Sequence, residues 1–142
     1  MPLQLEIVTP ERLAYSDQVD SVQLPGIEGE LGVLPHHAPL ISMLGAGELR
    51  LRKGGAEESF AIVGGFLQVL PDKVVVMAET ADMASDIDLE KAQEARRQAE
   101  QALESGFVEG ADLSAARAAL QTALLRIRVA ERRQHEGRRR HV

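Results

Sequence analysis

Apolar and polar side chains alternate with a period of two through roughly the first 80 residues, as in 3–7, 19–24 and 48–52. This pattern is typical of strands that bury one face. Glycine and proline punctuate the alternation at Pro10, Pro25-Gly26, Gly45-Ala46-Gly47, Gly54-Gly55, Gly64-Gly65 and Pro71-Asp72. About eight to ten short strands cannot bury one flat sheet, so residues 1–84 are predicted to form an antiparallel β-sandwich or flattened barrel.

Near residue 84 the period changes to that of helices, and residues 85–142 are predicted to form an α-helical hairpin. Acidic capping residues in 83–88 precede a first helix over about 87–105, which Gly106 ends. Its apolar stripe consists of Leu89, Ala92, Ala95, Ala99 and Leu103. After Gly110, Asp112 can cap a second helix that runs to about 134. Its apolar face consists of Leu113, Ala116, Leu120, Leu124 and Ile127.

So short a link places the two helices antiparallel, which makes the whole chain an α+β protein. The seam between the helices is rich in alanine, which buries few methylene groups. Each buried methylene stabilises by about 0.8 kcal/mol, so an alanine stripe holds less firmly than a leucine stripe. We therefore expect a hairpin that can come away from the surface on which it docks.

The net charge of −6 conceals a strong polarity along the chain. Residues 1–84 carry 5 basic and 12 acidic side chains, whereas residues 126–142 carry seven arginines against two glutamates. Beyond Ala130 the chain is polar all round, which predicts either a solvated, frayed tail or a guanidinium cluster for an acidic partner surface. Nucleic acid is disfavoured, because the cluster lacks aromatic residues and is attached to an acidic domain.

The sequence offers little catalytic chemistry. It has no cysteine, four histidines, and neither a G-x-S-x-G nor an H-E-x-x-H motif, so no catalytic residue is predicted. His36 and His37 are adjacent on an extended segment and point to opposite faces, so no metal site is predicted. No phosphate-binding loop is present. The amino terminus lacks a basic, apolar leader and no apolar run reaches about 18 residues, which predicts a protein that is cytosolic or peripheral to a membrane through a partner.

The segment 24–40 is punctuated by glycine and proline and leaves room only for short extended pieces joined by fixed turns. It reads LPGIEGELGVLPHHAPL and resembles the amino-terminal domain of the epsilon subunit of bacterial F-type ATP synthases. Further matches are FAIVGGFLQV at 60–69 and KVVVMAE at 73–79. The turn and docking residues that we carry over are Pro25, Gly26, Gly29, Gly32, Pro35, His37, Pro39, Gly64 and Gly65.

The resemblance implies a non-catalytic rotor subunit. Its sandwich would dock on the gamma subunit and the c-subunit ring, and its hairpin would regulate ATP hydrolysis by contacting acidic segments of the catalytic beta subunits within the alpha–beta head. The contacts with beta would be made by Arg126, Arg128, Arg132 and Arg133. The protein would lie on the cytoplasmic face of the plasma membrane, without inserting into it.

Some members of the family hold regulatory ATP between the two helices through an I/L-D-x-x-R-A motif and an arginine of the second helix. The matching positions here are Ile87, Asp88, Lys91, Ala92 and Arg126. The alternative is that Asp88 only caps the first helix and Lys91 is a solvated side chain. Two other functions are also open: a free-standing adaptor that binds one protein through each domain, and an independent ATP sensor.

Overall fold

The computed structural model describes residues 3–106 and 109–140, with side chains as far as Gln134. Contacts between Cα atoms divide the chain into two compact units, Met1–Met83 and Ala84–Val142. Each unit is described by itself. The terminal positions 141 and 142 of the arginine-rich tail lie outside the described residues, as do the side chains of 135–140.

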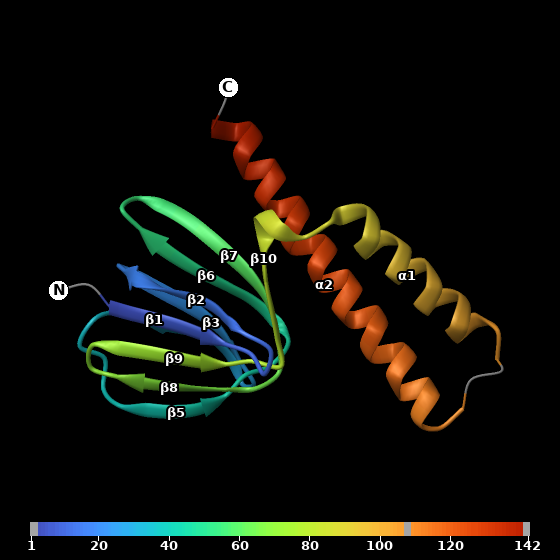
Figure 1. Cartoon of the computed structure of the whole chain (residues 1–142), viewed down its shortest axis with the longest axis horizontal. Coiled ribbons are helices and arrows are strands. Elements are labelled where there is room, and N and C mark those ends of the chain that lie inside the picture. Colours follow the sequence, from blue (N-terminus) through green and yellow to red (C-terminus); the bar gives the residue numbers. More distant parts are fainter. Residues whose placement is uncertain (1–2, 107–108, 141–142) are drawn as a thin grey trace. The chain divides into compact units, whose positions relative to one another are not determined.

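The first unit contains ten strands in two five-stranded sheets, which confirms the predicted sandwich. Sheet A has the order β2-β1-β9-β8-β5 and sheet B the order β10-β7-β6-β3-β4. Figure 1 shows β9 lying between β1 and β8. The strands are β1 (Leu3–Val8), β2 (Leu13–Val19), β3 (Ser21–Gly26), β4 (Gly29–Val33), β5 (Leu40–Met43), β6 (Gly47–Lys53), β7 (Ala56–Val63), β8 (Phe66–Leu70), β9 (Lys73–Met77) and β10 (Thr80–Met83).

One strand pair departs from the predicted antiparallel arrangement. β1 and β9 are parallel, with Leu5 opposite Val74 and Ile7 opposite Val76. Parallel neighbours need a long crossover rather than a hairpin turn, and here the intervening strands of both sheets supply it. Sequence alternation reveals which face of a strand is buried but not the direction of its neighbour, so it could not predict that β1 and β9 are parallel.

The core lies between the sheets and consists of the inward positions of the alternating pattern. Leu3, Leu5 and Ile7 of β1 are fully buried, as are many aliphatic side chains of the other strands. Tyr15 packs edge-on against Phe60, with the ring centroids 5.6 Å apart. This arrangement suits the ring quadrupoles and adds to the area that the two rings bury.

The second unit contains a 3₁₀ turn, η1 (Ala84–Asp86), and two helices, α1 (Leu89–Glu104) and α2 (Ala111–Arg140). The first helix is predicted to begin at about 87 but begins at Leu89, two residues later, because the Asp88 carboxylate accepts the Lys91 N–H at 3.1 Å and caps it there. Gly106 follows α1 with φ +72, the left-handed conformation that suits a helix end.

The second helix differs from the prediction at both ends. It starts at Ala111, so Asp112 lies in its first turn instead of capping it, and the Ser114 N–H donates to the Gly110 carbonyl at 3.1 Å. A carboxylate in the first turn still complements the helix dipole. At the other end the helix continues to Arg140 instead of ending near 134. Arginine, glutamate and glutamine sustain a helix without an apolar face, because their propensities are high.

The seam of the hairpin deviates from the predicted stripes at two positions. Ala95 and Leu124 are exposed, whereas Ala99 and Ala123 are buried. On α2 one stripe of half-buried and buried positions advances by three and four residues, as 113, 116, 120, 123, 127 and 130, and Leu125 and Val129 are buried beside it. The predicted stripe included Leu124 instead of Ala123 because leucine is the more hydrophobic residue. At that position the predicted stripe is therefore rotated by about 100° around the helix.

Candidate docking surface on the β-sandwich

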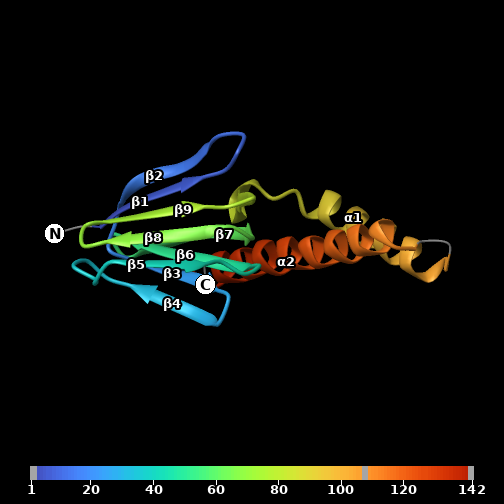
Figure 2. The same cartoon turned by 90° about the horizontal axis from the view of Figure 1, so that it is seen from below.

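A row of apolar side chains crosses the outer face of sheet A at one end. The register pairs Leu13 with Val8, Val8 with Met77, Met77 with Phe66, and Phe66 with Met43. Each residue neighbours an inward-facing core residue in sequence and therefore points outward. The row thus contains one side chain from every strand of sheet A, and Figures 1 and 2 show these strands side by side. We call it the apolar row.

The exposure of this row is unusual for side chains of its kind. Leu13 is 60% exposed, Met43 61% and Phe66 48%, and Ile41, which also points outward from β5, is 72% exposed. Toward the opposite end of the same face the outward positions become polar, as at Gln4 of β1 and at the ion pair between Lys73 and Glu6. Contiguous apolar surface of this kind marks interaction sites, whereas isolated exposed apolar residues do not.

The apolar row borders a groove of about 540 Å³. The groove is lined by Val8, Thr9, Pro10, Met43, Gly65, Phe66, Met77, Ala78 and Glu79. Its walls come from the end of β1, the turn that follows it, the start of β8 and the end of β9. Apart from Thr9 and the Glu79 carboxylate the side chains are apolar, and a mostly apolar concavity with few polar groups is the usual form of a recognition site.

Gly65 holds the start of β8 at the groove. Its φ is +105, and an added Cβ would lie 2.0 Å from the carbonyl oxygen of Met77. Its own carbonyl accepts the Leu44 N–H at 2.9 Å. Only glycine combines this backbone conformation with so close an approach. Gly65, predicted from sequence as a turn residue, therefore lets Phe66 pair with Met77 across the strands.

The predicted turn residues of the segment 24–40 lie in two places. Pro25 and Gly26 end β3, Gly29 begins β4, and the two-residue turn between these strands is Ile27-Glu28. An added Cβ at Gly26 would lie 2.6 Å from the Gly29 carbonyl oxygen, so the hairpin requires glycine there. Gly32, in contrast, has open space around it, and the structure gives no steric reason for glycine at this position.

The second turn contains Pro35 and the two histidines. The His37 N–H donates to the Leu34 carbonyl at 3.3 Å, and His36 has φ +67. Proline at the second position and a positive φ at the third define a type II turn, for which glycine is the preferred third residue. His36 adopts this conformation and donates its N–H to the Pro71 carbonyl at 2.6 Å. His37 Nδ1 lies 2.7 Å from the Ala38 carbonyl oxygen, and Pro39 precedes β5.

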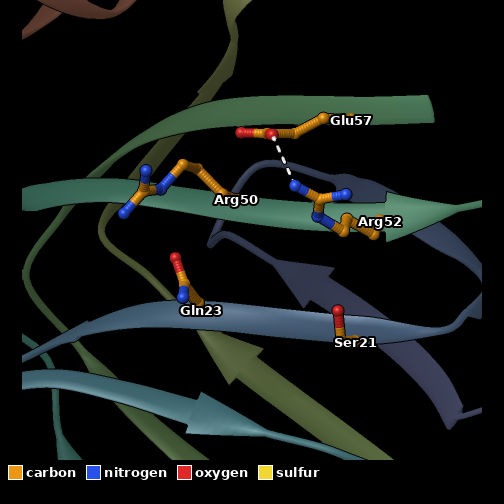
Figure 3. A pocket seen from close by; sticks show the side chains of 5 residues that line it. All are labelled: Ser21, Gln23, Arg50, Arg52 and Glu57. Atoms are coloured by element: carbon orange, nitrogen blue, oxygen red, sulfur yellow. Dashed lines mark ion pairs between the residues drawn. The ribbon is translucent and has the colours of Figure 1, made fainter. Parts of the chain in front are cut away.

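A smaller pocket of about 280 Å³ lies on sheet B. Ser21 and Gln23 of β3, Arg50 and Arg52 of β6, and Glu57 of β7 line it (Figure 3). Carboxylates accompany both arginines: Arg52 lies 3.8 Å from Glu57, and Arg50 lies 3.1 Å from Glu30 and 3.7 Å from Glu48. Three carboxylates around two guanidinium groups leave no positive excess to attract an anion.

The residues predicted to bind ATP lie at one level of the hairpin. α1 has 16 residues, and an equal length of α2 counted from Ala111 ends at Arg126, about 24 Å along the helix. Arg126 and the start of α1 are therefore at the same height. Ile87 is half-buried and Ala92 buried, whereas Lys91 is exposed. These positions thus share one level of the hairpin, while Asp88 already serves as the helix cap.

The four arginines predicted to contact the beta subunits do not share a face. At about 100° per residue, Arg126 and Arg133 are about 20° apart around α2, and Arg128 and Arg132 are about 40° apart on the other side. The helix divides them into two pairs, so a flat partner surface can contact only one pair at a time.

Among the described residues, no group of three or more His, Asp or Glu side chains is placed to hold a metal ion. In the same part of the chain, neither helix is long and apolar enough to cross a bilayer.

Sequence reasoning missed the apolar row, although a signal was present. The run Val74-Val75-Val76-Met77 is apolar without interruption, which is typical of a strand covered on both faces. A strand of an exposed sheet would have polar residues at alternate positions. The candidate docking residues named from the glycine motif shape the turns, whereas the exposed apolar area comes from the strand ends.

Comparison with known proteins connects both units to one family. The model of the ATP synthase delta/epsilon chain β-sandwich domain matches residues 2–84, and that of the long α-helix domain of the same chain matches residues 85–131. The ATP synthase epsilon chain of Dehalococcoides mccartyi BAV1 is 47% identical to this chain, and the match covers 92% of this chain and 94% of that protein. The ATP synthase epsilon chain of Herpetosiphon aurantiacus is 46% identical, and the match covers 95% of this chain and 98% of that protein.

Two solved structures share the fold. A chain in the Euglena gracilis mitochondrial ATP synthase (OSCP, F1 and c-ring) has a TM-score of 0.65 at 22% identity, covering 95% of this chain and 81% of that one. A chain in the central stalk and c-ring of the Tetrahymena thermophila enzyme has a TM-score of 0.55 at 14% identity, covering 93% and 96%. With both family models matched in order along nearly its whole length, the chain belongs to the ATP synthase delta/epsilon chain family.

Proposed function

We propose that this chain is a non-catalytic central-stalk subunit of a proton-driven rotary ATP synthase. Its sandwich docks on the gamma subunit and the c-subunit ring, and it couples rotation to ATP synthesis on the alpha–beta head. The observation that carries the proposal is the apolar row, which exposes Leu13, Phe66 and Met43 on one outer sheet face. Transferring this area to a partner removes apolar surface from water at about 25 cal/mol per Å².

The helical unit is the regulatory part in this proposal. α2 carries Arg126, Arg128, Arg132 and Arg133, and guanidinium groups suit acidic segments of the beta subunits through charge-assisted hydrogen bonds. The two pairs of arginines lie on different sides of α2. We therefore propose that one pair contacts beta while the other faces a different neighbour in the head.

The location follows from the docking. Neither described helix can span a bilayer, and the proposed partners include the membrane-embedded c-subunit ring. We place the chain on the cytoplasmic face of the plasma membrane, held there by its partners. This position needs no insertion of the chain itself.

The test is ATP hydrolysis by a synthase head depleted of its epsilon subunit, titrated with the full chain and with a version that ends at Ala84. The sandwich has its own core and forms a separate unit, so the shortened version should fold. Inhibition by the full chain only, with both versions bound to the head, would support the proposal. If neither version binds the head, the chain is not a rotor subunit and the adaptor function takes its place.

ATP as a regulatory ligand is a second proposal, favoured by one observation: Arg126 stands level with the start of α1, where Asp88 and Lys91 lie. ATP bound between the helices would stabilise the hairpin by about 2.7 kcal/mol at 100 times its dissociation constant. Isothermal calorimetry with the full chain tests it, with Lys91→Ala and Arg126→Ala as comparison variants. No heat up to millimolar ATP would leave Asp88 with its role as a cap alone.

A further inference from the structure

We propose that Arg96 biases the helical hairpin toward opening, because the closed seam between α1 and α2 buries its Nε–H without a hydrogen-bond acceptor. Opening here means that the two helices separate and expose the residues between them. The bias lies within the helical unit, whereas its consequence for ATP hydrolysis rests on the proposed function.

Arg96 lies in the middle of the stripe of α1 that faces α2. Figures 1 and 2 show the two helices side by side. Arg96 follows the buried Ala92 by four residues and precedes the buried Ala99 by three, and it is half-buried although the residues on either side of it in sequence are exposed. At about 100° per residue its direction falls between those of Leu89 and Leu103, which are also half-buried. The seam thus contains an arginine at a position that normally suits an apolar residue.

The guanidinium group of Arg96 has poor partners in the closed hairpin. Its Nε is buried and has no hydrogen-bond partner. Among the described residues the only carboxylate within ion-pair distance is that of Glu100, whose Oε1 lies 3.7 Å from Nε. An arginine that precedes its glutamate by one helical turn is also the less favourable orientation of such a pair. Glu100 therefore compensates little for the burial of this nitrogen.

The facing helix supplies no carboxylate at this level. Between Asp112 and Glu131 the sequence of α2 contains no acidic residue. Arg96 is the eighth residue of the 16 in α1, so in an antiparallel pair it lies level with about residue 119 of α2, within this stretch. The charged residue of α2 that is closest in sequence to this level is Arg117, which has the same sign.

Closing the hairpin therefore removes a donor from water without replacing the hydrogen bond that water made. A buried donor without an acceptor destabilises the closed form, and the open form returns it to water. The aliphatic stem of an arginine still covers apolar surface, so the helices pair, but a polar group at a seam position lowers the stability of the pair. Arg97 provides a contrast, because it is exposed and its Nη2 donates to Glu94 Oε2 at 2.6 Å.

The first experiment measures amide exchange in both helices of the full chain, without nucleotide. Arg96→Lys puts a methylene group where the buried Nε lies and keeps the positive charge, and Arg96→Met also removes the charge. The three residue types have similar helix propensities. Both variants should slow the exchange of the most protected amides of α1 and α2 about tenfold, because the closed form no longer contains an unpaired donor.

The matched controls are Arg97→Lys and Arg97→Met, the same substitutions at the exposed neighbouring arginine. Neither should slow the exchange, since Arg97 lies outside the seam. Circular dichroism checks that every variant keeps its helix content. If neither Arg96 variant exchanges more slowly than the unaltered chain, the bias toward opening is refuted. If Arg96→Met slows the exchange and Arg96→Lys does not, the buried Nε is refuted as its cause.

The second experiment measures inhibition of ATP hydrolysis in an epsilon-depleted synthase head. Arg96→Lys should require a several-fold higher concentration for half inhibition, because fewer chains are open while the charge available to an acidic partner is unchanged. If the unaltered chain does not inhibit, the proposed regulatory function fails, and the exchange data alone judge Arg96. If Arg96→Lys slows the exchange but inhibits as well as the unaltered chain, opening of this seam is refuted as a step in regulation.

Discussion

Replacing Gly65 by alanine should be among the most damaging single substitutions in the sandwich. The residue has φ +105, and the new Cβ would lie 2.0 Å from the Met77 carbonyl oxygen and 2.9 Å from the Ala78 Cα. The backbone conformation alone costs a residue with a side chain about 1–3 kcal/mol. The overlap is with backbone atoms rather than with the end of a flexible side chain, so β8 must move away from β9, which brings the expected loss to about 3–4 kcal/mol.

Gly54→Ala is the matched control. Gly54 also has a positive φ, +58, but nothing lies within 4 Å of an added Cβ. Its cost is that of the backbone conformation alone, about 1 kcal/mol. The difference between the two variants therefore isolates the close approach of β8 and β9.

The assay is urea unfolding followed by tyrosine fluorescence. Tyr15 is the only tyrosine, the chain has no tryptophan, and the Tyr15 ring packs against Phe60 in the sandwich. The signal thus reports the unfolding of the first unit. With a slope of about 1–3 kcal/mol per molar urea, Gly65→Ala should lower the midpoint by about 1 M or more relative to Gly54→Ala. Equal midpoints would show that the backbone relaxes cheaply and would refute this reasoning.

Three further predictions concern the other elements. Asp88→Ala should cost α1 about 1 kcal/mol through loss of its cap, measured as faster amide exchange at 89–92; unchanged exchange would contradict the role of the cap. The hydrogen bond from Lys53 lowers the pKa of Asp17 below its ordinary 3.8, so the ionised carboxylate stabilises the fold above that pH, and this contribution is lost as the pH falls through the lower pKa of the folded state. Asp17→Asn should therefore weaken the dependence of the unfolding free energy on pH in the acid range. An unchanged dependence would refute the role of this carboxylate. Amide exchange throughout the hairpin should be faster than in the sandwich core, and equal protection would argue against a seam that opens.

The sequence predicted best where one physical rule decided the outcome. Alternation located the strands because only one face of each could be buried, and the inward positions Leu3, Leu5 and Ile7 are indeed fully buried. Gly106 ends α1 with a left-handed backbone, as predicted from the preference for glycine after a helix end. In each case a local pattern and the packing demanded the same structure.

The prediction failed where two local rules competed or where the deciding contact was distant in sequence. Leu124 is more hydrophobic than Ala123, but the geometry of α2 placed the alanine in the seam. The apolar row joins residues from five strands, and only the register of the sheet brings Val8, Met77 and Phe66 side by side. The unbroken apolar run of β9 indicates only that this one strand is covered on both faces, and the rest of the row needs the register of the sheet, which explains why the turn residues were proposed for docking instead.

The two units differ in what holds them together, and the difference suits their proposed roles. The sandwich core buries large side chains such as Leu24, Phe60 and Ile62 almost completely. The helical unit instead buries mostly small residues such as Ala99 and Ala123, together with Leu125, Ile127 and Val129, while Leu103, Leu113 and Leu120 are half-buried. Burial of a leucine or phenylalanine stabilises by about 1.5–3 kcal/mol, several times what a buried alanine methyl contributes.

A rotor subunit needs a rigid part that transmits torque and a part that rearranges at low cost. A sheet held by a dense aliphatic core keeps the apolar row in register under load, because its side chains cannot move independently. The helical unit can exchange its alanine contacts for others of similar energy, so modest differences in partner contacts suffice to shift its position. The composition of the two cores therefore supports the proposal that the sandwich docks and the hairpin switches.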